Sequence, residues 1–67
     1  MEENFEKREI LKVIELNKGI SVEDIIEYLD YINKVRYSQR EVNLFLEDLI
    51  REQKVIFKNN LWYRMTH

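Results

Sequence analysis

The stretch SQREVNLFLEDLIREQKVIFKNNLWYRMT, from Ser38 to Thr66, predicts a capped amphipathic helix that leads directly into a hairpin. Ser38 and Glu41 have the spacing of a capping box, in which the serine oxygen accepts a hydrogen bond from a first-turn amide and the glutamate bonds the serine amide. The apolar residues that follow have the spacing of a helix with one buried face: Val42, Phe45, Leu46, Leu49 and Ile50. We therefore expect a helix over residues 39–53.

The spacing of apolar residues changes where this helix ends. Residues 54–58 and 61–65 are rich in β-branched and aromatic side chains, and Asn59-Asn60 between them tolerates the left-handed backbone of a two-residue turn. Such a turn sets the register of a hairpin and makes these cross-strand pairs: Phe57 with Trp62, Val55 with Arg64, and Ile56 with Tyr63.

The hairpin must pack one of its faces against the helices, and the sequence leaves two arrangements open. If Ile56, Tyr63 and Met65 pack inward, Phe57 and Trp62 are exposed and form an aromatic wing beside basic neighbours. If the pairing is shifted by one residue, the faces exchange and Trp62 belongs to the core. The exposure of these two rings therefore distinguishes the arrangements.

Two further amphipathic segments occupy the first half of the chain. Each follows a polar residue that can cap a first turn, and each has apolar residues at helical spacing. The first helix is expected over residues 5–17, with Asn4 as its N-cap and Gly19 just beyond its end. The second is expected to begin at Val22, with Ser21 as its N-cap, and to end between Tyr31 and Asn33. The expected core joins all three helices and consists of Ile14, Ile25, Ile26, Leu29, Val42, Phe45, Leu46 and Leu49.

Length and composition indicate one small globular domain over residues 1–67, of the α+β class and mainly α. The apolar fraction of 45% is that of a folded protein, and no apolar run approaches the roughly 20 residues of a membrane span. The acidic start of the chain lacks the features of a secretion signal, and no cysteine is present for a disulfide. We expect a cytoplasmic protein with no membrane partner.

The sequence argues against catalysis. Its single histidine, His67, is the last residue, so neither a nucleophile with a histidine base nor a histidine metal site can be assembled. Glu23, Asp24 and Glu27 form a carboxylate cluster that is typical of a solvated helix face, and one glycine cannot build a phosphate-binding loop. We expect no enzyme activity, metal, cofactor or small-molecule ligand.

This order of elements resembles the winged helix-turn-helix superfamily over nearly the whole chain. The residues that carry the resemblance are GISVEDIIEYL at 19–29, which looks like the entry into that family's second helix, the pattern Val42…Leu46…Leu49-Ile50, and YRMT at 63–66, which looks like the exit from its wing. The resemblance implies a short first strand near residues 19–21, a third helix that lies in the DNA major groove, and a wing that touches backbone or minor groove. Many members use the same surface for protein contacts.

A second resemblance is to the Z-form nucleic-acid binding domains. Residues 40–43 (REVN) and 61–62 (LW) are similar to their recognition helix and wing. The resemblance implies that Asn43 contacts the zigzag backbone and that Trp62 supports it. Three features depart from that pattern: Glu47 in place of a tyrosine, Gln39 in place of a lysine, and the absence of wing prolines.

Charge is distributed unevenly, because residues 1–33 carry nine acidic and four basic side chains, whereas residues 34–67 carry four acidic and seven basic. Attraction to phosphate needs such a local basic surface, so we expect DNA binding by a transcriptional or phage-type regulator, through the third helix and the wing. The outward face of the third helix comprises Arg40, Leu44, Glu47 and Arg51, flanked by Asn43 and Asp48. The expected nucleic-acid contacts are Gln39, Arg40, Asn43, Arg51, Lys58 and Arg64, with arginine suited to guanine and asparagine to adenine.

The same residues allow two other interpretations. The outward face of the third helix can be a solvated surface, on which Glu47 pairs with Arg51 one turn later. Alternatively, the chain is a protein-interaction module, for example an inhibitor or assembly factor, that binds a protein partner or a second copy of itself. The interface candidates are then Leu44, Phe57 and Trp62. A continuous positive surface from Arg40 to the wing would favour DNA.

Overall fold

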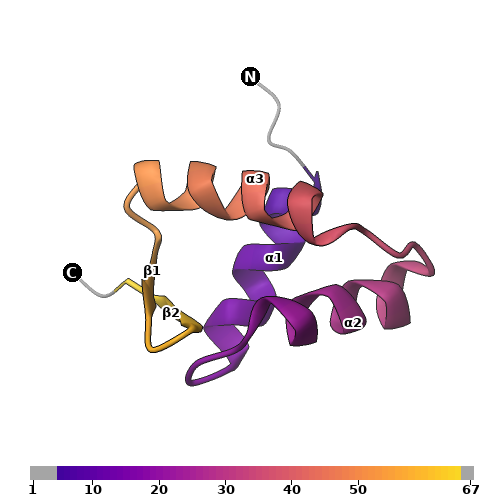
Figure 1. Ribbon diagram of the computed structural model, residues 1–67, viewed down its shortest axis with the longest axis horizontal. Helices are drawn as coiled ribbons and strands as arrows, with labels where there is room; N and C mark the ends of the chain where they lie inside the picture. Colours follow the sequence, from indigo (N-terminus) through magenta and orange to yellow (C-terminus); the bar gives the residue numbers. More distant parts are fainter. Residues whose placement is uncertain (1–4, 66–67) are drawn as a thin grey trace.

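The computed structural model describes residues 5–65 and confirms a mainly helical α+β fold with the expected order of elements (Figure 1). Its elements are α1 (Phe5–Leu16), α2 (Val22–Asn33), α3 (Gln39–Arg51), and the antiparallel strands β1 (Val55–Lys58) and β2 (Leu61–Arg64). The expected cap Asn4 lies outside the described residues. Within residues 5–65, no helix has the length and apolar character needed to cross a membrane.

The polar caps of α2 and α3 form as predicted. Ser38 Oγ accepts a hydrogen bond from the Glu41 amide at 3.1 Å, and the Glu41 carboxylate accepts one from the Ser38 amide at 2.9 Å. These two bonds complete the capping box of α3. At the start of α2, Ser21 Oγ accepts a hydrogen bond from the Asp24 amide at 3.2 Å. Both helices therefore begin where the sequence places them, because each cap satisfies a first-turn amide.

The first and third helices end slightly earlier than expected. In α3 the cause is Gln53, whose φ of 61° is left-handed and turns the chain toward β1. Its amide donates to the Ile50 carbonyl at 2.9 Å, and the Lys54 amide donates to the Leu49 carbonyl at 2.9 Å. This tight connection holds the hairpin beside the C-terminal end of α3.

A turn between α1 and α2 adds a short strand segment to the hairpin. Gly19 has a φ of 102°, and a Cβ atom at this position would lie 2.9 Å from the ring of Tyr63, so glycine fits here for two reasons. The next residue, Ile20, forms a bridge with Trp62: the Ile20 amide donates to the Trp62 carbonyl at 3.1 Å, and the Trp62 amide donates back at 2.8 Å. This bridge lies where the winged-helix resemblance implies a first strand.

The core lies where the helices and the hairpin meet, and α1 crosses behind α3 in the view of Figure 1. It consists of Ile10, Val13, Ile14, Ile20, Ile25, Ile26, Leu29, Val42, Leu46, Leu49, Val55 and Trp62. All of the predicted core residues are buried except Phe45, which is half-buried at the edge. Ile50 was expected in the buried stripe but is 43% exposed, because it lies about 40° around the helix from Leu46, on the side of the hairpin.

The hairpin has the predicted register, with the pairs Val55 and Arg64, Ile56 and Tyr63, and Phe57 and Trp62. Its packing differs from both expected arrangements. Without any shift in register, Trp62 is buried together with Val55, while Phe57 on the same face is 51% exposed. The prediction of an exposed Trp62 in this register is therefore wrong. Trp62 is held against the core by its bridge to Ile20. The exposed Phe57 packs against the Trp62 ring, with centroids 4.6 Å apart and ring planes tilted by 41°.

Candidate interaction surface

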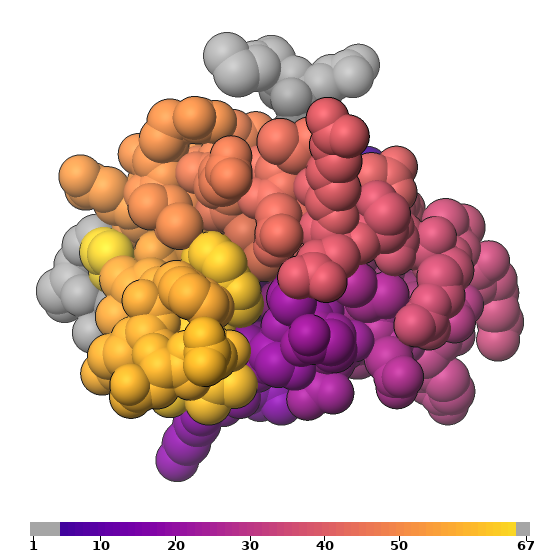
Figure 2. Space-filling model, viewed as in Figure 1, coloured from indigo at the N-terminus to yellow at the C-terminus, as the bar shows by residue number. Residues whose placement is uncertain are grey.

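A groove of about 380 Å³ lies between α3 and the hairpin, and Val22 at the start of α2 also lines it. Figure 2 shows the surfaces of these three elements meeting on one side of the molecule. The groove is lined by Val22, Gln39, Asn43, Glu47, Ile50, Phe57 and Trp62. Of these described residues four are apolar or aromatic, two carry amides, one carries a carboxylate, and none is basic.

One side of α3 supplies the polar wall of the groove. Gln39, Asn43 and Glu47 follow one another at intervals of four residues, so they lie on adjacent turns of the same side, and Ile50 continues this line toward the hairpin. The facing wall comes from Phe57 and Trp62 of the hairpin. Because α3 connects to β1 through one tight turn, the two walls are held in a fixed relation by local sequence.

The outer side of α3 carries a second set of exposed residues, Arg40, Leu44, Glu47 and Arg51, which we call the α3 stripe. Their spacing of four, three and four residues keeps them on one line along the helix. Leu44, near the middle, is 57% exposed. Glu47 lies on the border between the α3 stripe and the groove, so a ligand at either surface meets its carboxylate.

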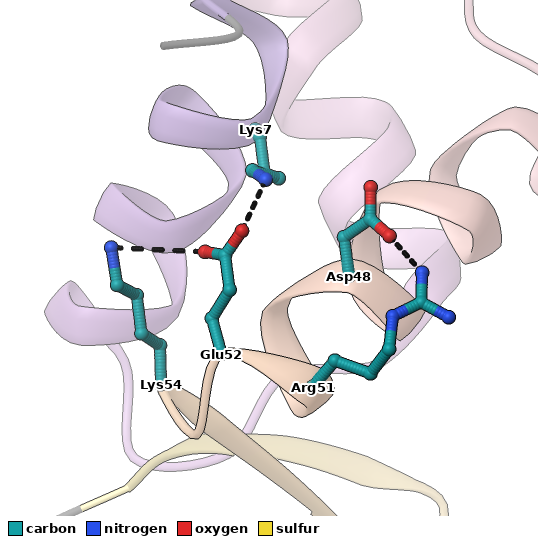
Figure 3. Close-up of polar contacts among 5 residues, drawn as sticks. All are labelled: Lys7, Asp48, Arg51, Glu52 and Lys54. Atoms are coloured by element: carbon teal, nitrogen blue, oxygen red, sulfur yellow. Dashed lines mark hydrogen bonds and ion pairs between the residues drawn. The ribbon is translucent and has the colours of Figure 1, made fainter. Parts of the chain in front are cut away.

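Ion pairs engage most of the cations near these surfaces. Arg51 pairs with Asp48, which lies three residues earlier in α3 (Figure 3). One interpretation of the sequence had expected Glu47 as its partner. At the end of α3, the Glu52 carboxylate lies 2.6 Å from Lys7 Nζ of α1 and 3.8 Å from Lys54 Nζ (Figure 3). These contacts leave local charge close to neutral along the C-terminal half of α3.

Neither cation of the hairpin, Lys58 or Arg64, lines the groove. Lys58 lies on the other face of β1 from Phe57, with its Nζ 5.4 Å from the centre of the Tyr63 ring. Arg64 lies with its Nε 3.8 Å from the Glu15 carboxylate of α1. A continuous positive surface between Arg40 and the wing is therefore absent from the described residues, since Glu47 and neutral side chains separate them.

The structure brings together only part of the predicted nucleic-acid site. Gln39 and Asn43 line the groove, whereas the four predicted cations are dispersed: Arg40 and Arg51 lie on the outer side of α3, Lys58 on the far face of the hairpin, and Arg64 beside α1. The two positions matched by the Z-form resemblance, Asn43 and Trp62, do line the same groove, together with Glu47.

The predicted protein-interface residues lie on two adjoining surfaces. Phe57 and Trp62 line the groove, Phe57 as an exposed ring and Trp62 as a buried one with only 7% of its surface exposed, while Leu44 belongs to the α3 stripe. The sequence pattern did not identify Ile50 as a surface residue, although it is 43% exposed. The sequence does contain this information, because a helical projection at 100° per residue places Ile50 between Gln39 and Asn43 on the same side of α3.

The groups with perturbed pKa values lie outside the groove. The Lys7 ammonium donates a hydrogen bond to Glu52 and lowers the pKa of that carboxyl group. Burial, and then the charge of Glu6, raise the pKa of Tyr37, whose hydroxyl donates to the Glu6 carboxylate at 3.3 Å. No cluster of metal-ligating side chains is found among residues 5–65.

Three helices followed by an antiparallel hairpin are compatible with a winged-helix layout. Comparison of the chain with protein-family models, with curated proteins and with solved structures found no match. The function proposed below therefore rests on the groove and the α3 stripe.

Proposed function

We propose that this chain is a protein-interaction module on a winged-helix scaffold, and that its groove receives an apolar or aromatic side chain of a partner protein. The observation that carries the proposal is the lining of the groove, which exposes Ile50 and Phe57 above the buried Trp62 and includes no basic residue. The buried centres of protein interfaces are rich in aromatic residues and poor in charge. A groove of this composition fits a protein side chain better than a phosphate.

The polar residues of the groove suit the rim of such an interface. Gln39 and Asn43 offer amide donors and acceptors beside the apolar floor, as an extended or helical partner segment requires for its own polar groups. The Glu47 carboxylate favours a partner with a basic residue at that end. The acidic outer face of α2, with Glu23, Asp24 and Glu27 exposed, adds general repulsion toward a polyanion.

A peptide-display selection on the purified chain tests this proposal. We expect the selected peptides to share an aromatic or long aliphatic residue, and their affinity to fall at least about tenfold in Phe57→Ala, as for an interface anchor. Leu16→Ala is the matched control, because Leu16 is an exposed apolar residue at the C-terminal end of α1 that does not line the groove. Failure to select any peptide, or affinities that Phe57→Ala leaves unchanged, would contradict a protein-binding groove.

DNA binding by a transcriptional or phage-type regulator is the second candidate, and Arg40 supports it. Its side chain makes no ion pair with another described residue, and it lies on the first turns of α3 near Gln39 and Asn43. Surface ion pairs contribute about 0–1 kcal/mol, so Arg51 and Arg64 can exchange their carboxylates for phosphates.

The second candidate predicts separable effects of single substitutions. Arg40→Ala should reduce the preference for particular base sequences, because arginine reads guanine. Lys58→Ala should lower the slope of log affinity against log salt by about 0.9, the value of one lost phosphate contact, without changing sequence preference. A Z-form ligand is disfavoured by Glu47, because its carboxylate lies in the groove where that resemblance implies a contact with the backbone.

A further inference from the structure

The α3 stripe has a pattern of charge that a single copy of the chain does not use. Arg40 and Glu47 carry opposite charges on the same line of α3, but seven residues separate them, which is about 10 Å along the helix axis. Neither side chain makes an ion pair with another residue of the described range 5–65. The exposed Leu44 lies close to the midpoint between them.

Such an arrangement is self-complementary when two copies of α3 lie antiparallel. A two-fold axis beside Leu44 brings Arg40 of each copy opposite Glu47 of the other. The ion pair between Arg40 and Glu47 therefore forms twice in the dimer. The two Leu44 side chains then meet near the axis and remove their exposed surface from water. Parallel packing would instead place like charges opposite each other, which is unfavourable.

We propose that the partner of this surface is a second copy of the same chain, docked antiparallel along the α3 stripe. The inference rests on the proposed function in that both make the chain a protein-interaction module, but the dimer is formed by the α3 stripe and not by the groove. The charges select the orientation, and Leu44 supplies the apolar centre. One pair of helices buries less area than a standard stable interface of about 800 Å² per partner, so we expect a weak, concentration-dependent dimer.

Charge reversal tests the reciprocal contact directly. In Arg40→Glu both contacts would join two carboxylates, and in Glu47→Arg both would join two guanidinium groups. We expect each variant to sediment as a monomer at protein concentrations, up to about 1 mM, at which the original chain forms dimers. An equimolar mixture of the two variants should form dimers again, because each contact then joins one carboxylate and one guanidinium group.

Two further variants test the apolar centre. Leu44→Asp should raise the dissociation constant of the dimer at least about tenfold, whereas Leu16→Asp, at an exposed leucine on α1, should leave it unchanged. Circular dichroism of every variant checks that the helices remain folded.

Three results would overturn the proposal: an original chain that is monomeric at about 1 mM, single charge reversals that still dimerise, or a mixture that stays monomeric. If the chain is monomeric while displayed peptides still require Phe57, the self-association proposal fails and the interaction module stands. If peptides also fail to bind, the proposed function fails with it.

Discussion

Phe57 and Trp62 are cross-strand neighbours with opposite environments, and this difference creates the candidate interface. Trp62 is fixed by two backbone hydrogen bonds to Ile20, so its indole forms part of the core. Phe57 packs against that indole in a tilted arrangement and leaves about half of its own surface in water. An aromatic ring that is ordered yet exposed is a suitable anchor for a partner, because little side-chain entropy remains to be lost on binding.

Leu46 tests the assignment of the core at the residue scale. It is fully buried in the centre of α3, so Leu46→Ala should lower the free energy of unfolding by about 2–5 kcal/mol. Leu44→Ala, two residues earlier on the exposed side, should change it by less than about 0.5 kcal/mol. Urea denaturation of both variants measures the difference. Equal effects at the two positions would show that the buried face of α3 is misassigned.

Glu52 predicts a pH dependence of stability. Because Lys7 lowers the pKa of Glu52 in the folded state, the ion pair stabilises the fold above the unfolded-state pKa of this carboxyl group, and the contribution is lost as the pH falls through the folded-state pKa. Glu52→Gln should therefore melt at a lower temperature than the original chain at about pH 7, and the difference should disappear as the pH falls through the folded-state pKa of Glu52.

Glu27→Gln is the control for this pH dependence, since it removes an exposed carboxylate of α2. We expect its melting temperature to follow that of the original chain over the same pH range. A constant gap between Glu52→Gln and the original chain across the acidic range would mean that the contact with Lys7 does not stabilise the fold.

At the scale of elements, helix starts follow from local chemistry that a sequence displays. The capping box of α3 joins residues only three apart, so its two hydrogen bonds are specified without any tertiary contact. Ser38→Ala should remove one of these bonds and lower the free energy of unfolding by about 0.5–2 kcal/mol. Urea denaturation measures this loss, and an unchanged midpoint would indicate that the first turn of α3 is held by packing alone.

The same reasoning explains how much of the fold was predictable. Helical spacing, caps and the Asn59-Asn60 turn depend on nearby residues, and the predicted helices, register and most of the core are confirmed. The inward face of the hairpin depends on the distant bridge between Ile20 and Trp62. No periodicity within residues 54–65 contains that information, so the sequence left the exposure of Trp62 open and wrongly tied its burial to a shift in register.

At the scale of the whole molecule, basic residues that are close in the sequence are not close on the surface. The second half of the chain has a basic excess, but its cations lie on separate faces, and several pair with carboxylates: Arg51 with Asp48, Lys54 with Glu52, and Arg64 with Glu15 of α1. The partner of Arg64 could not be assigned from sequence, because this pair depends on side-chain reach between β2 and α1. Within α3, both Glu47 and Asp48 have a spacing from Arg51 that allows a pair, and Arg51 pairs with Asp48. The candidate groove was predicted in part, through Gln39, Asn43, Phe57 and Trp62.

We propose that the groove and the α3 stripe bind protein and not DNA. The affinity of the chain for DNA at two salt concentrations tests this distinction most directly. Labelled random duplex DNA is titrated with the purified chain at about 50 mM and about 200 mM salt. With its cations dispersed, the chain should show little binding at either concentration. Tight binding at low salt that weakens about 100-fold at the higher salt, and that Arg40→Ala reduces, would indicate several phosphate contacts and contradict a protein-binding surface.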